Sequence, residues 1–192
     1  MPSTLNHRNS NNPATIKEVD MGFFSRLFGQ DPERSGENRS LVDHRDASES
    51  ESGIDSRTAA AVLDEIDIDT ALAAHENWKI RLESVIQGSS TEIFRPEHVC
   101  RDDLCDLGKW LHGSGQNRLG KFPAFSLVVA RHKHFHLQAS TVASLAQAGE
   151  PVKAIQLLNG GYQHASTQLA FLLKELKNEL VHRQTRRETR KY

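Results

Sequence analysis

The chain has 192 residues, of which 26% are charged and 37% hydrophobic, and its formal net charge is −1. This length predicts one domain with flanking segments, and no apolar run reaches the roughly 20 residues that a membrane span needs. The first residues lack the apolar core of a signal peptide, and two cysteines, Cys100 and Cys105, do not make a disulfide framework. We therefore expect a soluble protein of the cytoplasm.

The charge is unevenly distributed. Residues 1–67 carry 7 Lys/Arg and 13 Asp/Glu, whereas residues 68–192 carry 17 and 12. The basic excess of the second part is small and mixed with acidic residues, so it does not indicate nucleic-acid binding. A basic tail over residues 183–192 could contact acidic lipid or protein, but a solvated, frayed helix end is the simpler explanation and the one we favour.

Residues 1–56 are predicted to be flexible, because they contain too few apolar side chains to offset the entropy of ordering the chain. An apolar island at 21–29 holds three of the eight phenylalanines. It is either a short helix that docks on a partner or a membrane surface, or only a sticky segment that follows a natural start at Met21.

Residues 57–182 have the pattern of an all-α domain, and we expect a four-helix bundle with one short, irregular helix. The 3.6-residue period, capping residues, glycines and prolines predict four helices. They are Ile68–Ile86 with Asp67 or Asp69 as N-cap and Gly88 as stop, a short helix over 102–112, one from Pro123 to Gly149, and one that begins at Pro151. Gly160 and Gly161 fall inside the last helix, where they either bend it or admit a close neighbour.

Three histidines and a cysteine in these segments suggest a metal site. His75 lies on the apolar stripe of its helix, a position that alone is more typical of a core histidine. His132 and His136 are four residues apart, so both imidazoles lie on one helix face. Together with Cys105 they offer three nitrogen donors and one sulfur donor. This set suits tetrahedral zinc better than magnesium or calcium, which prefer oxygen donors.

Two other metal chemistries fit less well. A di-iron bundle needs a glutamate three residues before each histidine, and those positions hold Val129 and Lys133. A zinc hydrolase needs an open coordination position and a general base, for which Glu76 or Asp106 are the candidates. Four protein ligands leave no open position, so we expect a structural or sensory site and no enzyme activity.

The motifs resemble those of the chemoreceptor zinc-binding (CZB) domain family. The resemblance rests on His75 followed by Trp78, on Cys105-Asp106-Leu107-Gly108-Lys109-Trp110, and on His132-Lys133-His134-Phe135-His136. It covers roughly residues 60–180, and it implies that His75, Cys105, His132 and His136 bind Zn²⁺. Cys100 is expected to be a packing cysteine and His134 a solvated residue. His112 either complements the helix dipole or lies in the outer sphere of the metal.

The resemblance also implies a sensory function. Family members are usually attached to bacterial chemoreceptors or diguanylate cyclases, and zinc occupancy or oxidation of the ligating cysteine alters their output. No such output domain is visible here, so we expect a stand-alone module that acts on a signalling partner in trans, with a homodimer possible. The alternative is a helical adaptor whose zinc site is purely structural.

Overall fold

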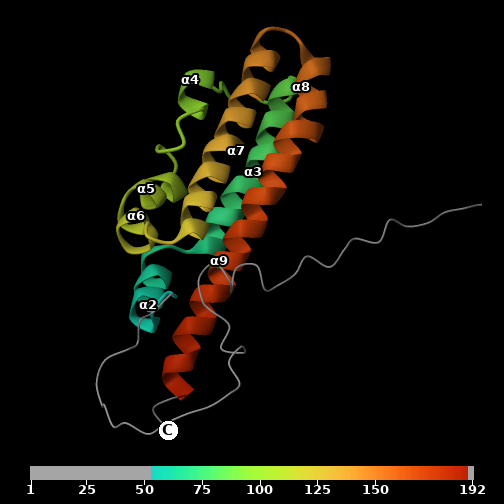
Figure 1. The fold of residues 1–192 in the computed structure, drawn as a ribbon. Helices are drawn as coiled ribbons and strands as arrows, with labels where there is room; N and C mark the ends of the chain where they lie inside the picture. Colours follow the sequence, from blue (N-terminus) through green and yellow to red (C-terminus); the bar gives the residue numbers. More distant parts are fainter. Residues whose placement is uncertain (1–52, 190–192) are drawn as a thin grey trace, which may run out of the picture.

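The computed structural model describes residues 53–189, and the side chains of residues 53–185, as an all-helical arrangement (Figure 1). The predictions for the apolar island at 21–29 lie outside this part of the chain. The elements in chain order are α2 (Ser56–Glu65), α3 (Ile68–Ile86), α4 (Pro96–Val99), α5 (Asp106–His112), α6 (Ser114–Leu119), α7 (Pro123–Gln147), α8 (Pro151–Leu157), η1 (Leu158–Tyr162) and α9 (Gln163–Thr189). None of the described helices is both long and apolar enough to cross a membrane.

Three long rods form the body of the domain: α3, α7, and the continuous run of α8, η1 and α9 (Figure 1). Short helices α4, α5 and α6 lie along the side of α7, and α2 packs against α9. The all-α prediction is confirmed. The predicted count of four helices is not confirmed, because several short helices lie beside the three long ones in place of a single fourth helix.

The ends of the long helices follow the predicted signals. The carboxylate of Asp67 accepts hydrogen bonds from the backbone N–H groups of Asp69 and Thr70 and so caps α3. Gly88 follows this helix with a φ of 69°, a left-handed conformation that glycine adopts without strain. Pro123 occupies the first turn of α7, and Gly149, with a φ of 71°, follows its end.

The short helix with the cysteine motif begins later than predicted. It starts at Asp106, because Cys105 has extended backbone angles and its sulfur accepts the N–H of Gly108 as an N-cap. The cysteine therefore lies in the turn before α5 and outside the helix.

Helices α2, α4 and α6 were not predicted. In α2, the side chain of Asp55 caps the first turn, and Ile54, Ala59 and Val62 are buried against the rest of the domain. Local capping and packing on α9 thus order α2, and with it Ile54 and Asp55 at the end of the region 1–56 that was predicted to be flexible.

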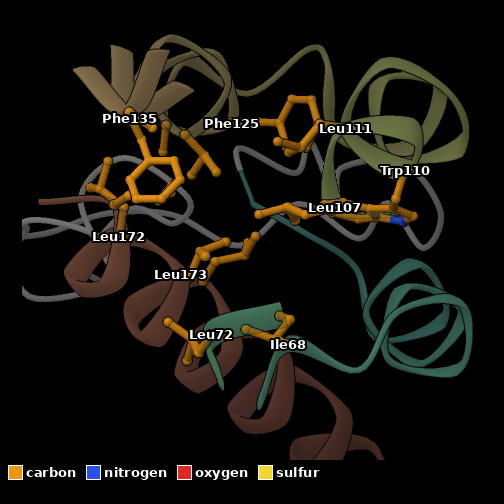
Figure 2. Packing of buried hydrophobic residues seen from close by; sticks show 14 of the residues in the cluster. Ile68, Leu72, Leu107, Trp110, Leu111, Phe125, Phe135, Leu172 and Leu173 are labelled. Carbon is orange, nitrogen blue, oxygen red and sulfur yellow. The ribbon is translucent and has the colours of Figure 1, made fainter. Parts of the chain in front are cut away.

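The cysteine motif is anchored in the hydrophobic core. Leu107, Trp110 and Leu111 of α5 are buried and join the cluster that Phe125 of α7 and Leu173 of α9 also form (Figure 2). The Trp110 ring meets the Phe125 ring edge-on at 5.8 Å. Because α5 is held by this packing, the turn with Cys105 is brought to a fixed place beside α7.

The glycine pair in the last rod falls in a wider helical turn, η1. A Cβ on Gly161 would come within 2.6 Å of Oε1 of Gln138, so the glycine admits a close neighbour from α7. The same turn carries Tyr162, whose ring is fully buried and lies 5.2 Å from that of Phe135. The turn therefore brings the third rod close to the helix that carries two of the candidate ligands.

Candidate metal centre

The four predicted residues meet at one place. His75 comes from α3, His132 and His136 from α7, and Cys105 from the turn before α5. One potential ligand atom of each lies within 4.8 Å of those of the other three. The three histidines are buried, and Cys105 is partly buried. Residues separated by up to 61 positions in the chain thus offer four donor atoms to one point.

Two of the histidines are oriented by backbone carbonyls. Nδ1 of His75 lies 2.7 Å from the carbonyl oxygen of Ala71, one turn earlier in α3. Nδ1 of His136 lies 2.8 Å from the carbonyl oxygen of Val99 in α4. Because a carbonyl can only accept, each Nδ1 carries the proton and each Nε2 has a free lone pair. Both Nε2 atoms are buried with no hydrogen-bond partner.

The remaining two donors face each other directly. Nε2 of His132 lies 3.3 Å from Sγ of Cys105. A tetrahedral zinc ion with bonds of about 2.0–2.1 Å to nitrogen and about 2.3 Å to sulfur holds those atoms about 3.5 Å apart. The observed separation and the two unpartnered Nε2 atoms therefore fit the geometry and the donor set of zinc.

Burial affects the metal-binding ability of the four donors in opposite ways: it favours the neutral imidazoles that bind a metal, but it disfavours the thiolate. Burial lowers the pKa of His75, His132 and His136, that of His132 to about 2, so the imidazoles stay neutral and able to bind. Burial raises the pKa of the Cys105 thiol, although the N–H of Gly108 offsets this in part. A bound cation would supply the positive charge that stabilises the thiolate.

Aromatic rings surround the imidazoles. The Phe135 ring lies 5.0 Å from that of His75, and the Trp78 ring lies 6.3 Å from that of His136. Trp78 thus packs at the site, whereas Trp110 fills the core beside Phe125. Phe135 covers His75 within the core, and Trp78 packs beside His136.

The cysteine side is open to solvent through a cavity of about 500 Å³. Its lining includes Cys105 and His136, together with Trp78, Ile93 and Leu104. Ile93 and Leu104 are exposed. A small reagent can therefore approach the sulfur and the edge of His136, whereas His75 and His132 do not line this cavity.

The other residues considered from the sequence occupy different places. Cys100 lies outside the cluster and donates its S–H to the carbonyl oxygen of Glu97 at 3.3 Å. His134 is partly buried on α7. His112 forms a hydrogen bond with Asp102, its Nε2 lying 2.8 Å from Oδ2 of the carboxylate. Sequence reasoning did not single out Asp102, and the backbone acceptors at Ala71 and Val99 leave no trace in the sequence because any residue supplies a carbonyl.

Comparison with known proteins gives one result. Residues 75–143 match the family model of the chemoreceptor zinc-binding domain. This segment contains all four residues of the cluster. The chain contains a chemoreceptor zinc-binding domain. No curated protein and no solved structure matches the chain.

The domain and the cluster together identify the metal as Zn²⁺ and the chain as a zinc-binding sensory module. When bound, the ion supplies a positive charge that favours the thiolate of Cys105 and links three separate parts of the chain.

Proposed function

We propose that the chain senses zinc or an oxidant through a centre made of His75, Cys105, His132 and His136. The observation that carries this proposal is the convergence of three neutral, buried imidazoles on one thiol. The thiolate form of a cysteine is the form that oxidants attack. Either loss of the ion or oxidation of Cys105 would remove a tie between the turn before α5 and the histidines of α3 and α7.

The cavity at Cys105 supports the oxidant branch of this proposal. It gives small molecules a path to the sulfur, which a fully enclosed zinc site would not offer. The carboxylates considered for a hydrolase do not support that alternative, since Glu76 is exposed and Asp106 pairs with Lys109 at the surface.

The output is proposed to act in trans on a signalling partner of the chemoreceptor or diguanylate cyclase type. The proposal assigns residues 57–182 to the zinc-binding domain, with an N-terminal region 1–56 and a basic tail 183–192 on either side. It places the chain in the cytoplasm, either alone or as a homodimer, and gives it no catalytic activity.

The first test is metal content. We expect one zinc per chain in protein purified without added metal, and loss or strong weakening of zinc binding in Cys105→Ala. The matched control is Cys100→Ala, which removes the other thiol of the same loop and should leave zinc bound. A wild-type protein that is folded and metal-free, and that binds no zinc when zinc is added, would refute the proposal.

The second test separates a sensor from an adaptor with a structural ion. In the Cys100→Ala background, Cys105 is the only thiol, and its oxidation by hypochlorous acid or peroxide can be followed by mass spectrometry alongside zinc release to an indicator dye. Oxidation that weakens zinc binding before the protein unfolds supports sensing. A site that keeps its zinc and its thiolate until the protein denatures favours the adaptor.

A further inference from the structure

His132 differs from the other two histidines of the cluster in one respect. Its ring is fully buried, yet Nδ1 has no hydrogen-bond partner, whereas the Nδ1 atoms of His75 and His136 each meet a backbone carbonyl. A buried, unpaired ring nitrogen costs free energy. The acceptor at hand is a carboxylate, since Oδ2 of Asp102 lies 3.9 Å from this Nδ1.

Asp102 is held in place from two directions. Its Oδ2 also lies 2.8 Å from Nε2 of His112, at the far end of α5. Its backbone packs against α5 so closely that a Cβ on Gly108 would overlap the carbonyl oxygen of Asp102. Only 14% of the carboxylate side chain is exposed. This side chain is therefore a largely buried, fixed negative charge beside the centre.

We propose that Asp102 is a positioning residue for His132, and that His112 holds its carboxylate in that role. The carboxylate accepts the Nδ1 proton of His132, which fixes the ring so that Nε2 presents its lone pair towards Cys105. The gap of 3.9 Å exceeds a hydrogen bond by about 1 Å, a distance that a small rotation of either side chain closes when the four donors draw together. A carboxylate that holds a metal-binding histidine in this way raises both the basicity and the preorganisation of that ligand.

The inference rests on the proposed function, because it takes His132 to be a zinc ligand. It predicts that zinc binding requires residues beyond the four donors. The centre should depend on a carboxylate that touches no metal, and through His112 on the packing of α5.

The test compares three variants of the full chain by competition with a zinc-chelating dye. Asp102→Ala should weaken zinc binding by about 10–100-fold, and His112→Ala should weaken it by less. Asp103→Asn is the matched control, because Asp103 is the neighbouring carboxylate but pairs with Arg101 at the surface, 2.6 Å away. It should bind zinc as the wild type does. Asp102→Asn keeps the side-chain size and an acceptor oxygen, so it should fall between Asp102→Ala and the wild type.

A second readout separates positioning from general stability. In the zinc-loaded protein, the Nδ1 proton of His132 should give a downfield NMR resonance that exchanges slowly with water. This resonance should move upfield or exchange rapidly in Asp102→Ala and stay unchanged in Asp103→Asn. A purely structural role of Asp102 would lower the melting temperature of the metal-free protein and leave this proton as it is.

The outcomes distinguish the two proposals. If Cys105→Ala and His132→Ala lose zinc while Asp102→Ala binds it with wild-type affinity and an unchanged Nδ1 proton, the positioning role is wrong and the metal centre stands. If Cys105→Ala and His132→Ala themselves keep wild-type zinc affinity, the proposed centre is wrong, and the role of Asp102 falls with it.

Discussion

Gly108 joins the cysteine turn to α5 at a point where no side chain fits. Its N–H donates to Sγ of Cys105 at 3.2 Å, and a Cβ at this position would overlap the backbone oxygen of Asp102. Because the obstacle is backbone, relief requires the whole turn to move. We expect Gly108→Ala to lower the free energy of unfolding by about 1–3 kcal/mol and to weaken zinc binding, as measured by urea denaturation and dye competition.

Gly160 provides the control for this substitution. A Cβ at position 160 would meet no atom within 4 Å, so Gly160→Ala should be neutral or slightly stabilising and should not affect zinc. Equal behaviour of the two alanine variants would show that the close approach at position 108 does not constrain the turn.

The three buried imidazoles make the stability of the metal-free protein depend on pH. Burial lowers the pKa of each, whereas in the unfolded chain they titrate near 6.5. Below about pH 6.5 the unfolded chain therefore binds more protons than the folded one, and stability falls as the pH falls. Each such imidazole adds at most about 1.4 kcal/mol per pH unit to the slope.

This pH dependence can be measured by urea denaturation of chelator-treated protein between about pH 7.5 and about pH 5. His132→Leu should reduce the slope, because it removes one of the three groups. His164→Gln changes an exposed histidine of α9 outside the cluster and should leave the slope as it is. A stability that does not change over this range would contradict the burial of neutral imidazoles.

At the scale of the elements, the segment between α3 and α7 is fastened in two different ways. Near α4, Oγ of Ser140 donates to the carbonyl oxygen of Pro96 at 2.8 Å, and the side-chain amide of Gln147 donates to that of Phe94. Neither bond involves a candidate ligand, although a third contact does, since Nδ1 of His136 donates to the carbonyl oxygen of Val99 in α4. The turn that leads into α5 has its link to α7 at the site itself, through Cys105 and His132.

This difference predicts where the structure responds to zinc removal. Amide hydrogen exchange should rise over residues 100–108 after chelation, while α4 and the long rods keep their protection. The second half of α5 should change little, because Leu111 stays buried in the core. Cys105→Ser should reproduce the pattern without a chelator. A uniform rise throughout the domain would indicate global unfolding and would refute a local response.

The long helices and the short helix α5 were predictable from the sequence, whereas α2, α4 and α6 were not. The helix Ile68–Ile86 has enough turns for its period to be visible, and Asp67 and Gly88 mark its ends. Helices α4 and α6 have four and six residues, too few for any periodicity to show. The start of α5 was placed too early because a cysteine as N-cap is not a common signal.

The candidate site was predictable to a similar degree. Residue types and motif spacing selected the four donors, since sulfur and nitrogen ligands are recognisable by their chemistry. The link between Asp102 and His112 spans ten residues and depends on how the turn folds back onto α5. No sequence pattern encodes that contact, although His112 had been considered for the outer sphere.

At the scale of the whole molecule, the described hydrophobic core includes residues N-terminal to α3, the first long helix. Ile54 and Val62 are buried at 1% and 0% exposure, and α2 packs on α9. Because residues 1–52 contain few apolar side chains outside the island at 21–29, we expect their removal to leave zinc affinity and the unfolding free energy unchanged. Removal of residues 1–66 should cost about 3 kcal/mol or more, because two large aliphatic side chains leave the core and one side of α9 is uncovered.

Thermal or urea denaturation of the two truncated proteins, with zinc stoichiometry measured on each, tests this boundary. If the shorter truncation already destabilised the domain, residues before Ile54 would have to contribute to its packing.

The placement of the donors also bears on reversibility. Three of them lie within long helices that are packed into the core, and one lies in a turn at the mouth of a cavity. When the sulfur is lost as a donor, the imidazoles stay where the helices hold them. Under the proposed redox function, reduction of an oxidised Cys105 would restore the fourth donor to three imidazoles already in place, so that recovery would take a local rearrangement of a few residues. One polypeptide could then pass through many cycles of oxidation and reset.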